Sequence, residues 1–378
     1  MIIIAIIGIV SAGSGITTWL LLPKSPPSNN SAPSSNNQPA KPAVVATPIS
    51  CVEKLPTDIK IGQKLMFAAY SDRLATETPL LAASKVGGII VMDQIDKASL
   101  DAYTASMAIK PTIATDQEGG TVQRYKTEGT LPGATDTART LTTQQAYAQY
   151  LKDAQYLKSV GITTNFAPVV DVMRAEPSPL PGRMFSTDPA TVVSYATQAI
   201  KASSTAGVTP VIKHFPGLGS SSGNTDFGPA TTESLDVLKT RDLIPYQQLS
   251  PLRPDVMIAN VTVPGLTDGQ PAVWSAAALS LLRSYGYQNS VTYTDSLTAR
   301  AVPGTLEDAA VKSWQAGVDV ALIVQTRQQT ADLQQYLSLI TTRATNAVAS
   351  GELSADSLNQ SVLRILMRKG VNPCEISM

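Results

Sequence analysis

The sequence has few of the residues on which several common classes of enzyme depend. Its 378 residues include two cysteines, Cys51 and Cys374, and one histidine, His214. A zinc site built from several histidines and a cysteine-rich metal motif are therefore excluded. No Gly-x-Ser-x-Gly segment is present, which argues against a serine–histidine–aspartate hydrolase. Acid–base or nucleophilic chemistry would fall to Asp and Glu.

An excess of charge of either sign is also missing. The chain has 29 basic and 29 acidic residues, so its formal net charge is zero. No basic run is longer than a pair. Because nucleic-acid binding needs a basic patch or stripe, we expect no nucleic-acid partner.

The first 22 residues contain no charged side chain. A helix of that length can cross a bilayer core of about 30 Å. Residues 23–50 are rich in Pro, Ser, Asn and Ala, a composition that does not bury enough apolar surface to fold. We therefore predict a transmembrane anchor at 1–22, a disordered linker at 23–50 and a folded domain at 51–378 outside the cell membrane. A cleaved signal peptide, which would leave the domain secreted, is the alternative.

The two cysteines lie at the two ends of the predicted domain. Outside the cytoplasm, Cys51 and Cys374 are expected to form a disulfide that joins these ends. Two free thiols are the alternative.

Short apolar runs alternate with longer amphipathic stretches along the domain. The runs are mostly β-branched, as in parallel strands covered on both faces. Eight such β/α units predict a single-domain α/β fold, a TIM-type (β/α)8 barrel. An open doubly wound sheet is the alternative, but no Gly-x-Gly-x-x-Gly follows the first run. The predicted strands are 63–69, 88–92, 111–115, 163–168, 209–213, 256–261, 290–294 and 318–324, and the clearest predicted helices are 142–160, 189–206, 275–285 and 306–316.

Polar residues follow most of these runs. In a barrel, the carboxyl ends of the strands meet at one mouth, so these side chains are expected to converge there. They are Asp116, Asp171, the Lys213–His214 pair, Asn260 and Asp295.

Six segments, in order, resemble glycoside hydrolase family 3, and specifically the single-domain β-N-acetylhexosaminidases of the bacterial cell-wall recycling type. The match covers nearly all of residues 55–370. The segments are Asp-Gln-Glu-Gly-Gly-Thr-Val-Gln-Arg at 116–124, Asn-Phe-Ala-Pro-Val-Val-Asp-Val at 165–172, Gly-Arg-Met-Phe-Ser-Thr-Asp-Pro at 182–189, Lys-His-Phe-Pro-Gly at 213–217, Val-Thr-Tyr-Thr-Asp-Ser-Leu at 291–297 and Ala-Gly-Val-Asp at 316–319.

The resemblance implies a role for each matching polar residue. Asp295 would be the nucleophile that forms a covalent glycosyl-enzyme. The hydroxyl groups of the sugar would be held by Asp116, Arg124, Arg183, Lys213 and His214. The resemblance implies neither a metal nor a cofactor, because two carboxylates supply both the nucleophile and the proton.

One loop departs from the family pattern. Where the recycling-type enzymes have Asp-Ser-His, with the histidine as general acid/base, this chain has Asn224-Thr225-Asp226. We interpret Asp226 as the acid/base and expect Asn224 to orient it by donating a hydrogen bond. Glu118 and Glu233 are weaker candidates: Glu118 is expected to stabilise its own Gly-Gly turn, and Glu233 to start a helix. The run of Ser and Gly at 220–224 also predicts a mobile loop that closes over the substrate.

These features predict a retaining, exo-acting β-N-acetylhexosaminidase that removes terminal β-linked N-acetylglucosamine. Peptidoglycan or related cell-wall glycan fragments would be its substrate, and the N-terminal segment would contact the membrane. A β-glucosidase or another β-glycosidase of the family is one alternative. A catalytically impaired domain that only binds sugar or cell wall is the other.

Overall fold

The computed structural model describes residues 47–126, 131–174, 178–326 and 333–376. The predicted membrane segment and most of the predicted linker lie outside these residues. Within them, no helix combines the length and apolar character that a membrane crossing requires. Helix α1 (Pro48–Lys54) begins three residues before the predicted start of the domain at Cys51.

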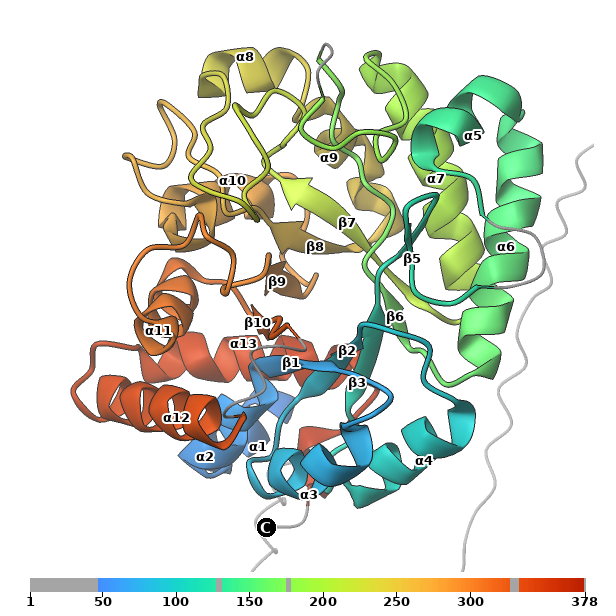
Figure 1. Cartoon of the computed structure of the whole chain (residues 1–378). Coiled ribbons are helices and arrows are strands. Elements are labelled where there is room, and N and C mark those ends of the chain that lie inside the picture. The colour runs from blue at the N-terminus through green and yellow to red at the C-terminus, as the bar shows by residue number, and fades with distance from the viewer. Residues whose placement is uncertain (1–46, 127–130, 175–177, 327–332, 377–378) are drawn as a thin grey trace, which may run out of the picture. The chain divides into compact units, whose positions relative to one another are not determined.

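Eight parallel strands form a nearly closed barrel (Figure 1). Neighbours follow the order β10-β1-β2-β3-β6-β7-β8-β9, and a parallel bridge between Tyr293 and Val320 links the two ends of this order. The α/β fold is therefore consistent with the predicted TIM-type barrel, and the open-sheet alternative does not fit it. The barrel strands are β1 (Leu65–Ala69), β2 (Gly88–Val91), β3 (Thr112–Thr115), β6 (Thr164–Asn165), β7 (Thr209–Phe215), β8 (Asp255–Ile258), β9 (Thr292–Thr294) and β10 (Ala321–Ile323).

Helices surround the strands, and the four clearest predicted helices are all present (Figure 1). Thr142 caps α6 through a capping box with Gln145. Gly317 ends α11 in a left-handed conformation that costs glycine little. Besides α1, the helices are α2 (Thr57–Gln63), α3 (Leu74–Ala83), α4 (Lys97–Ser106), α5 (Ala134–Thr140), α6 (Thr143–Ser159), α7 (Pro189–Thr205), α8 (Leu235–Thr240), α9 (Ile244–Leu249), α10 (Ala276–Ser284), α11 (Leu306–Ala316), α12 (Leu333–Ala349) and α13 (Ala355–Arg368).

Both faces of the barrel wall are apolar. Along β1, Leu65 and Phe67 belong to the large core between strands and helices, whereas Met66 and Ala68 belong to the smaller cluster inside the barrel. This alternation explains why the strands appear in the sequence as continuous apolar runs.

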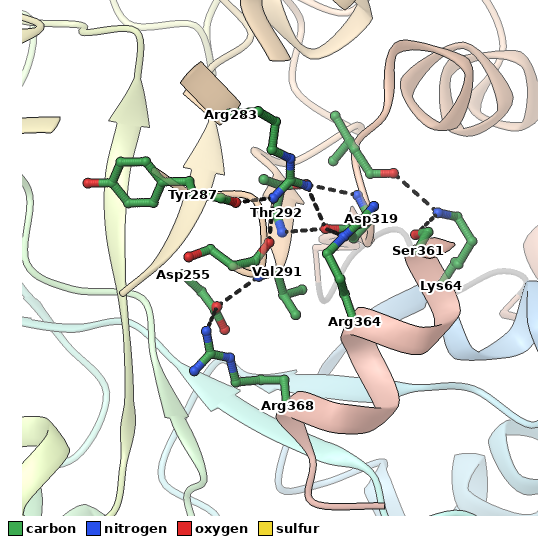
Figure 2. A network of polar contacts seen from close by, with 12 residues as sticks. Lys64, Asp255, Arg283, Tyr287, Val291, Thr292, Asp319, Ser361, Arg364 and Arg368 are labelled. Atoms are coloured by element: carbon green, nitrogen blue, oxygen red, sulfur yellow. Dashed lines mark hydrogen bonds and ion pairs between the residues drawn. The ribbon is translucent and has the colours of Figure 1, made fainter. Parts of the chain in front are cut away.

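Helix α13 closes the end of the barrel at which the strands begin, which we call the barrel floor (Figure 2). Its Arg364 donates to Asp319 at 2.7 Å, and its Arg368 contacts Asp255 at the same distance. Burial alone would raise the pKa of Asp319, but Arg364 and Arg283 outweigh it and bring the pKa to about 2. These ion pairs fix the floor relative to α13.

A disulfide joins Cys51 in α1 to Cys374, across a sequence separation of 323 residues. Helix α1 also packs Val52 and Leu55 against Leu358 and Val362 of α13. The two ends of the described chain are thus tied together beside the barrel floor.

Candidate functional site

A cavity of about 230 Å³ lies at the carboxyl end of the strands. Its wall includes the side chains of Asp116, Arg124, Arg183, Lys213, His214, Asn224, Asp226 and Asp295. These residues come from four separate strand ends and the loops that follow them. The barrel therefore gathers them at one place, as the positions of the polar residues predict. Asp171 and Asn260, which were also expected at the mouth, do not line the cavity; Asn260 donates to the Ser296 carbonyl at 2.7 Å.

A short antiparallel hairpin, β4 (Gln117–Gly119) and β5 (Val122–Gln123), follows β3. The sequence analysis did not predict it. The buried Gln117 organises the hairpin: its Oε1 accepts from the backbone N–H groups of Arg124 and Tyr125, and its Nε2 donates to Asp153. The hairpin thereby places Arg124 on the same side of the cavity as Asp116 and Glu118.

Two carboxylates and three cations form an ion network along this wall. Lys213 Nζ lies 2.7 Å from Asp116 Oδ1 and 2.6 Å from Glu118 Oε1. Arg183 donates from Nε and Nη2 to Glu118 at 2.8 and 2.9 Å, a bidentate pair. Arg124 lies 3.7 Å from Asp116. The network fixes long side chains that would otherwise be free to move.

The network also keeps its carboxylates ionised. Burial alone would raise the pKa of Asp116 and of Glu118, but the nearby cations outweigh it and hold both below their ordinary values. Burial would likewise lower the pKa of Lys213, yet the two carboxylates raise it. The wall therefore presents fixed charges, which make stronger hydrogen bonds to hydroxyl groups than neutral partners do.

The expectation that Glu118 supports its own turn is wrong. Its carboxylate points to Arg183 and Lys213, so it joins two strand ends across the cavity wall. The sequence contained one signal for this role. Glu118 lies two residues after Asp116, and side chains two residues apart in an extended segment point to the same side.

Asp171 holds the single histidine in place. Its Oδ2 lies 2.7 Å from Nδ1 of His214, and its Oδ1 accepts from the backbone N–H of Leu218 at 2.7 Å. Because a carboxylate only accepts, Nδ1 carries a proton, and Nε2 is left for a ligand. Asp171 was placed at the mouth from the sequence, but this anchoring role was not predicted.

Asp295 follows β9 and takes part in the cavity wall. Its Oδ1 accepts from the backbone N–H of Ser296 at 2.7 Å. Burial raises the pKa of Asp295; His214 opposes this rise, and the carboxylate of Asp226 adds to it. Asp226 and Asp295 both line the cavity.

In the loop that carries Asp226, Asn224 makes a different contact from the one predicted. Asn224 Oδ1 accepts from the backbone N–H of Asp226 at 2.9 Å, so it shapes the turn and does not donate to the Asp226 carboxylate. Such a bond to the residue two positions on is the ordinary behaviour of asparagine in turns. Asp226 itself is exposed, and its backbone carbonyl accepts from Arg300 at 3.4 Å.

Glu233 lies outside the cavity wall and precedes α8, which begins at Leu235. Its carboxylate forms ion pairs with Arg174 and Arg241. Its expected place near a helix start is therefore correct, and it also joins neighbouring loops.

Asp226 and Asp295 in the wall of one hollow, at the mouth of an α/β barrel, are the arrangement that glycoside hydrolases with paired acids use. The model of the family described as "Glycosyl hydrolase family 3 N terminal domain" matches residues 56–367. The chain belongs to glycosyl hydrolase family 3 and is a glycoside hydrolase.

Relatives similar to the chain carry a narrower name. "Beta-hexosaminidase LpqI" of Mycobacterium tuberculosis is 35% identical over 367 residues, covering 91% of this chain and 92% of the relative. The solved structure of that protein superposes with a TM-score of 0.79 at 33% identity, over 86% of this chain and 97% of the other. The β-N-acetylhexosaminidase of Beutenbergia cavernae gives a TM-score of 0.75 at 25% identity, over 84% and 100%.

Proposed function

We propose that the protein is a retaining, exo-acting β-N-acetylhexosaminidase that releases terminal β-linked N-acetylglucosamine. One observation carries the proposal: Asp295, Asp226 and the ion network around Lys213 surround the same small cavity. A volume of about 230 Å³ is below the range of roughly 300–1,000 Å³ of sites for drug-sized ligands. It suits one sugar ring, as removal of a terminal sugar requires. The similar proteins named β-hexosaminidases support the choice of sugar.

In the first step, the Asp295 carboxylate attacks the anomeric carbon and forms a covalent glycosyl-enzyme. The carboxylic acid of Asp226 gives its proton to the departing oxygen. In the second step, Asp226 takes a proton from water, which attacks the same carbon and releases Asp295. Two displacements retain the configuration of the sugar.

The rest of the wall holds the sugar. Asp116 and Lys213 present fixed charges to its hydroxyl groups, and Arg124 and Arg183 flank them. His214, held by Asp171, offers Nε2. Because these groups are already ordered by one another, little conformational freedom is lost when the sugar binds.

The source of the substrate follows from the predicted location. We propose that residues 1–22 anchor the chain in a membrane, that residues up to the start of α1 form a linker, and that the full TIM-type barrel works outside the cell. Fragments of peptidoglycan are the β-linked N-acetylglucosamine glycans expected there.

The test is hydrolysis of an aryl β-N-acetylglucosaminide by the full chain. The wild type is expected to release the phenol, and Asp295→Ala to lose this activity. Asp236→Ala, an exposed aspartate outside the cavity wall, serves as the matched control and keeps full activity. Faster hydrolysis of the matching glucoside would instead identify a β-glucosidase.

A sugar-binding domain without turnover is the second candidate, because Asp226 is exposed and Asn224 does not orient its carboxylate. It predicts that N-acetylglucosamine binds to the wild type and raises its melting temperature, while neither aryl glycoside is hydrolysed. Turnover that depends on Asp295 rules this candidate out.

A further inference from the structure

Two hollows on the barrel floor are lined by basic side chains. One, of about 130 Å³, is lined in part by Lys110, Lys158, Arg368 and Lys369. The other, of about 680 Å³, shares Arg368 and adds Arg253. Neither lining includes an Asp or Glu from the described part of the chain. The hollows adjoin through their shared residue, so they form one surface.

Several of these cations are not neutralised by the protein. Lys110, Lys158 and Arg253 are exposed and form no ion pair with any other described residue. Lys369 donates to two neutral oxygens, Gln63 Oε1 at 2.8 Å and the Gly87 carbonyl at 2.6 Å, and burial lowers the pKa of Lys369 to about 7, so this residue is not a fixed cation. We call the three exposed residues, Lys110, Lys158 and Arg253, the basic floor. The Cys51–Cys374 region adds two exposed carboxylates, Glu53 and Glu375, of which Glu375 accepts a hydrogen bond from Asn372.

An apolar side chain accompanies the basic floor. Met367 in α13 is 56% exposed and lines the larger hollow together with Leu363. An apolar side chain beside cations suits a surface that rests on lipid headgroups, because the cations meet phosphates and the apolar group enters the acyl boundary.

The chain enters the described domain at the same end. Thr47 is within one helical turn of Cys51, and Cys51 is bonded to Cys374, a few residues after α13. Beside this entry, Val52 and Ile109 belong to one apolar cluster, and Ile109 adjoins Lys110 of the basic floor. A segment of 46 residues precedes this entry point, and its first 22 carry no charge.

We propose that the basic floor and Met367 form a docking surface for a membrane that contains anionic phospholipids. In this orientation, the phosphates of the headgroups contact Lys110, Lys158 and Arg253, and the sugar-binding cavity faces away from the membrane. The surface is separate from the cavity, so this docking does not depend on the proposed activity.

The test uses the full chain mixed with nanodiscs of neutral lipid or of neutral lipid with anionic phosphatidylglycerol. Exposed lysines are labelled with an amine-reactive reagent and read by mass spectrometry. Lys110 and Lys158 are expected to lose labelling several-fold on the anionic nanodiscs but not on the neutral ones. Lys152 and Lys201, exposed on the helical side of the barrel, report the background and are expected to stay equally labelled.

Charge variants give the matched comparison. Each lysine near an anionic surface is worth about 1 kcal/mol, or about fivefold in affinity. The K110Q variant should therefore need about fivefold more anionic lipid for the same protection of Lys158, whereas K152Q should match the wild type. Equal labelling of Lys110 and Lys158 on both nanodiscs would overturn the proposal. Protection by soluble polyphosphate alone, with none on anionic nanodiscs, would also overturn it.

Discussion

Replacing Glu118 by glutamine removes one negative charge from between Arg183 and Lys213 without changing the shape of the side chain. In the wild type, Glu118 is 4% exposed as a side chain and contacts both cations within 2.9 Å. Removing one partner of a buried ion pair lowers the free energy of unfolding by about 3–5 kcal/mol. The glutamine keeps one acceptor for Arg183, and Asp116 still balances Lys213, so we expect a loss of about 2–4 kcal/mol in the free energy of unfolding.

The assay is equilibrium unfolding in urea, for the wild type and Glu118→Gln, with the slope against urea checked for equality. Glu352→Gln is the matched control, because Glu352 forms a comparable bidentate pair with Arg343 at the surface. An exposed pair is screened by water, so this control should leave stability nearly unchanged. A Glu118→Gln variant as stable as the control would refute the reasoning.

The effect should also depend on pH. The folded pKa of Glu118 lies below its ordinary value, so its contribution is present above the unfolded pKa of about 4.3. It is lost as the pH falls through the folded pKa. The difference between wild type and variant should therefore be constant from about pH 5 to 8 and shrink in more acidic solution. A difference that grows below pH 4 would contradict this sign.

Two further predictions concern the disulfide and the catalytic loop. The Cys51–Cys374 bond closes a sequence separation of 323 residues, for which chain entropy gives up to about 6 kcal/mol, so reduction should lower the melting temperature clearly. An unchanged melting temperature would contradict this. A Cβ at Gly219 would lie 1.7 Å from the Val172 carbonyl oxygen, whereas nothing lies within 4 Å at Gly223. Gly219→Ala should therefore displace the loop and lower kcat/KM about 100-fold, and Gly223→Ala should not; equal activities would refute the clash.

The parts of the fold that follow from periodic patterns were predictable from the sequence. Helix α11 has the predicted bounds, and the predicted helices before Gly161, Gly207 and Gly286 end at glycines with positive φ angles. The strands are present, but most are shorter than the apolar runs. Backbone pairing in a barrel ends where strands diverge, and the side chains remain apolar beyond that point because helices still cover them.

The site was predictable as a set of residues but not as a set of contacts. Strand ends place Asp116, Lys213 and Asp295 at one mouth, and the structure brings them to one cavity. The partner of each group depends on rotamers and on hairpin geometry across the barrel. For this reason the sequence did not predict that Glu118 binds Arg183 or that Asp171 holds His214. The closure of the 220–224 loop stays a prediction.

The central claim, that Asp226 transfers the proton while Asp295 forms the covalent bond, is tested most directly with Asp226→Ala and an aryl glycoside that has a strongly acidic leaving group. Such a substrate needs no proton donor, so the glycosyl-enzyme on Asp295 should still form and then accumulate. Added azide, which needs no base, should restore turnover and give the β-glycosyl azide. No acceleration by azide, or an α-configured product, would contradict the account.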